Sequence, residues 1–133
     1  MFSKPNKSNN RIDSLIGAGT VIKGDITFSG GLRVDGEVHG NVSAAADASG
    51  TLVLSEHARI DGAVKVSNLV VNGTINGPIY STEFIELQSH ARVTGDVEYR
   101  AIEMQLGAVV QGRLVYQDEV AVRAVELKLA SGH

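Results

Sequence analysis

The sequence predicts an all-β protein, a single-stranded parallel β-helix of about six coils with three short strands in each coil. One position, held by Gly or His, recurs along the chain at spacings of 17, 21, 16, 17 and 17, which indicates a stacked repeat. Between these positions apolar residues come in i, i+2 couples, the period of β-strands. Glycines also recur every four or five residues. Because each would cost a helix about 1 kcal/mol, a helical repeat is excluded.

The first repeating position predicts a structural corner in each coil. Its members are Gly19, Gly36, His57, Gly73, His90 and Gly107. We expect positive φ at this corner, which Gly adopts freely and His tolerates better than most residues. Two coils at about 4.8 Å each would separate the two histidines by nearly 10 Å, too far to share a zinc ion easily. The histidines are therefore interpreted as corner residues and not as metal ligands or catalytic groups.

A second repeating glycine lies four or five residues further on in each coil, two residues before an aliphatic residue. Its members are Gly24, Gly40, Gly62, Gly77, Gly95 and Gly112. The stretch "SAAADASG" (43–50) interrupts the spacing and predicts a surface bulge. The last two coils repeat at a constant spacing of 17, which pairs Ile85 with Ile102, Leu87 with Met104, Ala91 with Ala108, Val93 with Val110, Val97 with Leu114 and Tyr99 with Tyr116.

The repeat divides the chain into a β-helix domain over residues 15–117, a flexible N-terminal tail over 1–14 and a C-terminal tail over 118–133. The C-terminal tail alternates apolar and charged residues, and we expect it to be largely disordered, although it also fits a cover for the last coil or a partner contact. Neither end of the repeat shows a cap, so both terminal coils should present open strand edges. We expect end-to-end self-association through Ile16, Ile22, Ile26, Val110, Leu114 and Tyr116.

Composition excludes several kinds of chemistry. The chain has no cysteine and a net charge of −3, which disfavours thiolate metal sites and nucleic-acid binding. It has no Gly-Lys-Ser/Thr phosphate loop and no recognisable Ser, His and acid spacing. We therefore expect no metal, no cofactor, no nucleotide and no enzymatic activity.

The N-terminus predicts a peripheral membrane contact. Residues 1–11 carry three basic residues and no acid, and no run of eighteen apolar residues or secretory signal is present. An apolar side chain can enter the headgroup region while the basic residues contact anionic lipid. The expected membrane-binding residues are Met1, Phe2, Lys4, Lys7 and Arg11.

The repeat phrases "VDGEVHGNV", "IDGAV", "VNGTINGPI", "VTGDV" and "VQGRL" together resemble the bactofilins, bacterial cytoskeletal proteins, over about residues 14–117. The resemblance implies a right-handed β-helix that assembles without nucleotide into non-polar filaments. The opening "MFSKPNKS" resembles the family's membrane-targeting peptide. The implied location is the cytoplasmic face of the inner membrane. The implied partners are the protein itself, anionic lipids and peptidoglycan-synthesis or remodelling proteins, for which the filament would be a scaffold in cell shape or envelope growth.

One alternative remains from the residues themselves. The segment "IGAGTVI" matches a hexapeptide repeat, and Ile16, Ile22, Phe28 and Val34 keep a period of six. That period is typical of left-handed β-helix acyltransferases. The spacing from coil to coil then settles at 16 to 17 instead of 18. A hexapeptide-type acyltransferase or a small binding solenoid that forms a discrete oligomer is the second hypothesis.

Overall fold

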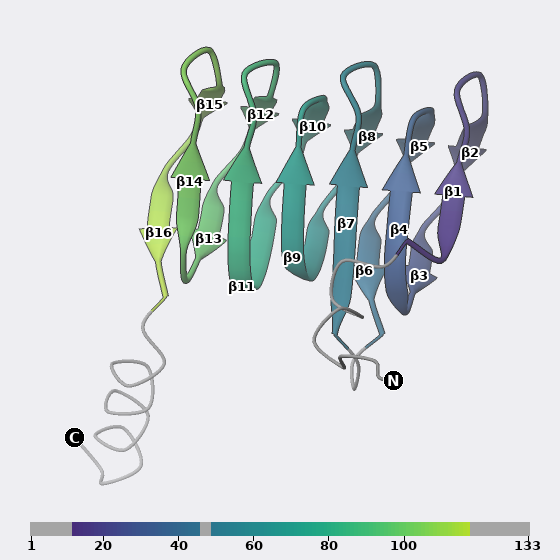
Figure 1. The fold of residues 1–133 in the computed structure, drawn as a ribbon, viewed down its shortest axis with the longest axis horizontal. Helices are drawn as coiled ribbons and strands as arrows, with labels where there is room; N and C mark the ends of the chain where they lie inside the picture. The colour runs from purple at the N-terminus through teal and green to yellow at the C-terminus, as the bar shows by residue number, and fades with distance from the viewer. Residues whose placement is uncertain (1–11, 46–48, 118–133) are drawn as a thin grey trace, which may run out of the picture.

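A computed structural model describes residues 12–45 and 49–117. These residues form a β-solenoid of 16 strands with no helix. Each of six coils contributes one strand to each of three faces, and Figure 1 shows the coils side by side in chain order. The predicted fold class, with about six coils and three strands in each, is confirmed.

The three faces are parallel ladders. The first strands of the six coils are β1 (Ser14–Ile16), β4 (Gly30–Val34), β7 (Gly50–Leu54), the second half of β9 (Val64–Val71), the second half of β11 (Ile79–Leu87) and β14 (Ile102–Met104). The second strands are β2 (Val21–Lys23), β5 (Glu37–His39), β8 (Arg59–Asp61), β10 (Thr74–Asn76), β12 (Arg92–Thr94) and β15 (Val109–Gln111). The third strands are β3 (Ile26–Phe28), β6 (Val42–Ala44), the first halves of β9 and β11, β13 (Val97–Tyr99) and β16 (Leu114–Tyr116).

The register expected for the last two coils is the one observed. Ile85 pairs with Ile102, and Val93 pairs with Val110. On the third face Tyr99 pairs with Tyr116. A constant spacing keeps the same side chains on the inner surface in successive coils, because strand residues alternate between the two surfaces.

The core consists of aliphatic residues stacked coil on coil. On the second face the central inward residues Val38, Ile60, Ile75 and Val93 are all buried. Ile60 pairs with Val38 on one side and with Ile75 on the other. Each inner side chain is therefore covered by its equivalents in the two adjacent coils, and only the terminal coils lack one of these covers.

The first corner takes two forms. Coils one, three, five and six make a four-residue turn, as in the turn where the Ala58 amide donates to the Ser55 carbonyl at 3.1 Å. Coils two and four make a shorter bend at residues 35–36 and 72–73.

The expectation of positive φ at this corner is wrong for four of its six residues. Gly19 (+87°) and Gly107 (+102°) have it, and no described residue other than glycine does, which excludes His57 and His90. A turn closed by a bond from residue i to residue i+3 forms with negative φ at both central positions when it is type I, so histidine needs no unusual backbone there.

Gly36 and Gly73 also lack positive φ, and lack of space explains both glycines. A Cβ at Gly73 would lie 2.5 Å from the carbonyl oxygens of both Ser55 and Ala58 in the turn of the preceding coil. Most of the second repeating glycines meet a similar limit, since a Cβ at any of them from the second coil onward would collide with the carbonyl of the equivalent glycine one coil earlier. Close approach between coils therefore selects glycine at Gly36 and Gly73, and it acts together with positive φ at most of the second repeating glycines.

The described strands begin at Ser14 and end at Tyr116. Just before the first strand, the Asp13 amide already donates to the Gly31 carbonyl at 2.8 Å. Part of the predicted bulge, residues 46–48, and the two tails, apart from residues 12–14, lie outside the described residues.

Candidate assembly interface

The two ends of the solenoid carry open strand edges. Within residues 12–45 and 49–117, the first-coil strands β1, β2 and β3 pair only with the second coil, and the sixth-coil strands β14, β15 and β16 pair only with the fifth. Unpaired backbone N–H and C=O groups at such an edge are a template for another β-strand. Each end can therefore extend its ladders with further strands.

The C-terminal end combines these edges with exposed apolar side chains. Leu114 is 44% exposed and Tyr116 is 60% exposed, although both occupy inward positions of β16. Val97, which pairs with Leu114 one coil earlier, is fully buried. The Tyr116 ring packs on Tyr99 with centroids 5.9 Å apart and planes tilted by 59°. Up to Gln117, the last described residue at this end, no seventh coil covers these side chains, which accounts for their exposure.

The N-terminal end is apolar but better covered. Ile16 is only 8% exposed, and Ile22 and Ile26 are half-buried and pack against the core. The six residues expected at an end-to-end interface all belong to the terminal coils, three at each end: Ile16, Ile22 and Ile26, and Val110, Leu114 and Tyr116. Contact of these residues with a second copy stays a prediction.

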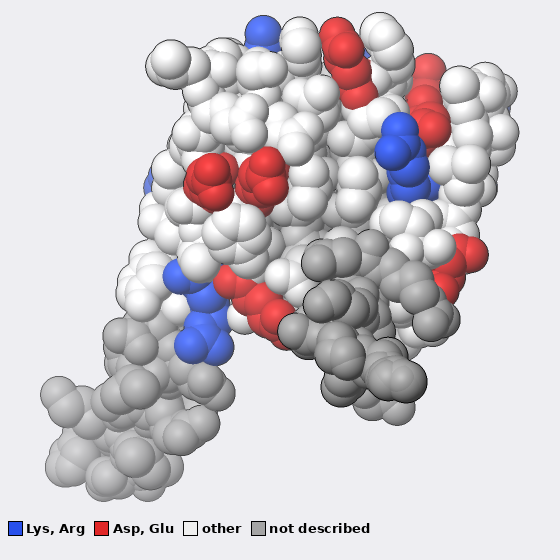
Figure 2. Space-filling model, viewed as in Figure 1, with Lys and Arg blue, Asp and Glu red and all other residues white. Residues whose placement is uncertain are grey.

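The expected membrane contact falls on Met1, Phe2, Lys4, Lys7 and Arg11, all outside the described residues. No helix among the residues that the structure describes is long and apolar enough to cross a bilayer. On the face drawn in Figure 2, basic side chains are scattered between acidic and uncharged ones and form no continuous stripe.

The two corner histidines lie on the surface of turns. The His90 amide donates to Asn72 Oδ1 at 3.0 Å, and His90 Nε2 lies 3.5 Å from Glu56 Oε2, which belongs to the turn two coils earlier. In the described part of the chain no group of three or more His, Asp or Glu residues is arranged to hold a metal ion. The turns thus contact each other across the short bend of the fourth coil.

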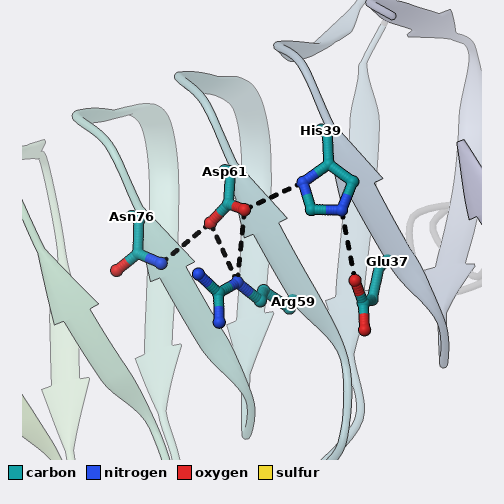
Figure 3. Close-up of polar contacts among 5 residues, drawn as sticks. All are labelled: Glu37, His39, Arg59, Asp61 and Asn76. Carbon is teal, nitrogen blue, oxygen red and sulfur yellow. Dashed lines mark hydrogen bonds and ion pairs between the residues drawn. The ribbon is translucent and has the colours of Figure 1, made fainter. Parts of the chain in front are cut away.

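A polar network on the outer surface of the second face is the feature that sequence reasoning missed (Figure 3). Asp61 Oδ2 lies 2.9 Å from His39 Nδ1, and Asp61 Oδ1 accepts from Asn76 Nδ2 at 2.8 Å. Arg59 Nε donates to both Asp61 oxygens, at 3.0 and 3.2 Å. The Asn76 amide, then Arg59 and His39, hold the pKa of Asp61 below its usual value. One carboxylate therefore ties together three successive coils.

The network was hidden because its members are far apart in sequence. His39, Asp61 and Asn76 are the last residues of β5, β8 and β10, so they form one outward row across the ladder. The shared register position, one residue before each second repeating glycine, was the available signal. The arrangement carries no serine, cysteine or lysine among its members, and its chemistry is that of coil-to-coil attachment.

Comparison with known proteins agrees with this geometry. The family described as "Bactofilin: Polymer-forming cytoskeletal" matches residues 14–115. The chain is 30% identical over 107 residues to Bactofilin BacP of Myxococcus xanthus (strain DK1622), covering 80% of this chain and 43% of BacP. It is 26% identical over 102 residues to Bactofilin BacO of the same organism, covering 77% of this chain and 78% of BacO. The chain thus spans less than half the length of BacP. No solved structure matches. A six-coil solenoid with open apolar ends and this family match over nearly all its coils shows that the chain belongs to the bactofilins, a family of polymer-forming cytoskeletal proteins.

Proposed function

We propose that this protein assembles end to end, without nucleotide, into non-polar filaments that act as a scaffold on the cytoplasmic face of the inner membrane. The observation that carries the proposal is the uncovered sixth coil, where Leu114 and Tyr116 face inward and yet reach solvent. Membership of a polymer-forming family supports self-association as the use of this surface.

Stacking of a second copy would cover both the exposed apolar side chains and the open strand edges of the C-terminal end. The partner's terminal coil would cover Val110, Leu114 and Tyr116, and burial of apolar surface contributes roughly 25 cal/mol for each Å². Its strand edges would also meet the unpaired N–H and C=O groups of the terminal strands. Aromatic residues such as Tyr116 are favoured anchors in interfaces. None of these contacts involves a nucleotide, so assembly is expected in its absence.

Membrane attachment is assigned to residues 1–11. Their three basic residues would each contribute roughly 1 kcal/mol near an anionic surface, so a single copy binds weakly. A filament presents many such segments to one membrane and gains affinity through multivalency. On such a membrane the filament is proposed to recruit peptidoglycan-synthesis or remodelling proteins.

Electron microscopy of the purified full chain without nucleotide tests the proposal. Leu114→Arg and Tyr116→Arg should each abolish filaments while the circular dichroism spectrum stays that of β-structure, because a buried unpaired charge disfavours the stacked state. Val115→Arg is the matched control, since Val115 lies on the opposite surface of the same strand, next to Glu98 in the ladder.

Two outcomes would contradict the proposal. Filaments of normal length from both Leu114→Arg and Tyr116→Arg would show that the C-terminal end is not the contact. A compact trimer from the unmodified chain would favour the discrete oligomer of an acyltransferase or binding solenoid instead.

A further inference from the structure

The outer surface of the first face carries apolar residues at its centre. On a sheet with one solvated side, the outward residues are expected to be polar. On the second face the third and fourth coils turn Arg59 and Thr74 outward, as expected. On the first face the same two coils turn Val53 and Val70 outward, and both are only half-buried. These two valines form an apolar patch on a surface that is otherwise polar or charged in the coils next to them.

Charged residues flank the two valines, with opposite signs on the two sides. In ladder register with the valines stand Arg33 on the second coil, Glu86 on the fifth and Glu103 on the sixth. Figure 2 shows two acidic side chains side by side over β14 and β11, uncharged surface over β9 and β7, and a basic side chain over β4. The charge along this outward row therefore changes sign from the N-terminal to the C-terminal coils.

Neighbouring side chains orient the two innermost charges and leave part of each without a partner. Arg33 Nε donates to Asp35 Oδ1 at 2.9 Å, and within the described ranges neither Nη nitrogen of Arg33 has a partner. Glu86 Oε2 accepts from Gln88 Nε2 at 3.1 Å and from Gln105 Nε2 at 3.3 Å, while Oε1 accepts from no described residue. Each group can thus make a further charge-assisted hydrogen bond with little loss of side-chain freedom.

We propose that the first face packs against the first face of a second copy whose solenoid axis runs in the opposite direction. The two-fold axis lies parallel to the strands, between the third and fourth coils, so it reverses the order of the coils and keeps the outward row over itself. Arg33 of each copy then meets Glu86 of the other, twice by symmetry, and Val53 meets Val70. Packed sheets lie about 10 Å apart, a space that side chains from both faces fill.

The pattern of charge selects both the direction and the register of this pairing. If the two axes ran in the same direction, Arg33 would oppose Arg33 and Glu86 would oppose Glu86, and such like-charge contacts are costly. A shift of the second copy by one coil would place either Arg33 against Val70 or Glu86 against Val53, which would leave a covered charge without a partner. The antiparallel register alone pairs charge with charge and valine with valine.

The face is small for a stable pair of single chains. Six coils at about 4.8 Å, with strands of 3 to 5 residues at about 3.3 Å each, give roughly 300 to 500 Å² on each copy. A standard interface buries about 800 Å² on each partner. Single chains should therefore pair weakly, whereas filaments present many copies of the face and pair firmly through multivalency. The strength of the pairing thus rests on the proposed filament, although the contacts belong to the single chain.

Exchange of the two charges in the full chain tests this pairing by electron microscopy. Filaments of the natural chain should lie side by side at low salt and separate as salt screens the charges. Arg33→Glu and Glu86→Arg should each give single filaments, because each variant sets like charges opposite one another twice. The double variant Arg33→Glu with Glu86→Arg restores opposite charges and should restore the side-by-side pairing.

Lys65→Glu is the matched control. It makes the same change of net charge as Arg33→Glu, but Lys65 is exposed on the outer surface of the third face. Its filaments should still pair. Circular dichroism checks that every variant keeps the β-structure of the natural chain.

Three results would overturn the inference: side-by-side filaments from both single variants, a double variant that stays unpaired as the single variants do, or single filaments only from the natural chain. If the natural chain makes no filaments, the end-to-end assembly is wrong, and sedimentation of concentrated single chains then scores the face. A weak dimer that each single variant loses and the double variant regains would still support the pairing. A natural chain that stays monomeric there would overturn the pairing as well.

Discussion

Gly73 offers the sharpest test of how the coils are held together. A Cβ there would lie 2.5 Å from the carbonyl oxygens of Ser55 and Ala58, and both are backbone atoms that no side-chain movement relieves. Restoring an ordinary contact requires the coils to separate by about 1 Å. The Thr74 amide donates to Ala58 at 3.0 Å and the Arg92 amide to Gly73 at 2.9 Å, so both bonds lie where the backbone must move.

The stability cost of Gly73→Ala can be estimated from these contacts. Overpacking costs typically about 1 to 3 kcal/mol. Each weakened hydrogen bond costs up to about 1 kcal/mol more. Alanine also restricts the unfolded chain more than glycine does, which offsets about 0.4 to 1 kcal/mol of this cost. Taken at their central values, these contributions give a loss of about 2 kcal/mol in the free energy of unfolding for Gly73→Ala.

Two further glycines, one in the corner column and one just before it, distinguish steric crowding from backbone conformation as the reason for glycine. Gly17 has open space around its Cβ position and no positive φ, whereas Gly19 has open space but a φ of +87°. Gly17→Ala should change stability by less than about 1 kcal/mol, and Gly19→Ala should cost about 1 to 2 kcal/mol through backbone strain alone.

The assay is urea unfolding followed by circular dichroism, at a protein concentration where sedimentation shows single chains, because assembly would raise the apparent stability. If Gly73→Ala proves as mild as Gly17→Ala, close approach is not the reason for glycine in the short bends.

The double variant His57→Ala with His90→Ala should change the free energy of unfolding by no more than about 1 kcal/mol and leave filaments intact. Both side chains are on the surface, and neither residue has a positive φ that alanine would have to adopt. Loss of filaments by microscopy with an unchanged fold would instead indicate a chemical role. Because the pKa of Asp61 is lowered in the folded state, its contribution is present above about pH 4 and is lost as the pH falls further, so the unfolding free energy should drop more between pH 7 and pH 3 in the natural chain than in Asp61→Asn. The unfolding free energy is measured by denaturation at several pH values. If it falls equally with pH in both proteins, the network around Asp61 does not stabilise the fold. Finally, the full chain should sediment with anionic vesicles and be released at about 1 M salt, where screening extends only about 3 Å. If a variant that lacks residues 2–11 sediments equally well, these residues do not attach the filament to the membrane.

The sequence by itself determined the number of coils, the ladder register and the aliphatic core. These depend on which residue types recur and at what spacing, and a period of 17 with i, i+2 couples admits few arrangements. The pairing of Val97 with Leu114 and of Tyr99 with Tyr116 followed from that count alone. Within residues 12–45 and 49–117, the terminal strands have open edges as the repeat predicts.

Only the tertiary structure decided what each repeating residue does. The sequence showed glycine and histidine in one column. In the structure, Gly73 lies in a short bend where a side chain would collide with the preceding coil, whereas His57 lies in a four-residue turn that has room for a side chain and needs no positive φ. The network around Asp61 also required the folded chain, since His39 and Asn76 lie 22 and 15 residues away and meet it only when coils stack. A repeat fixes which residues are equivalent, whereas the distances between neighbouring coils fix what equivalent residues can contact.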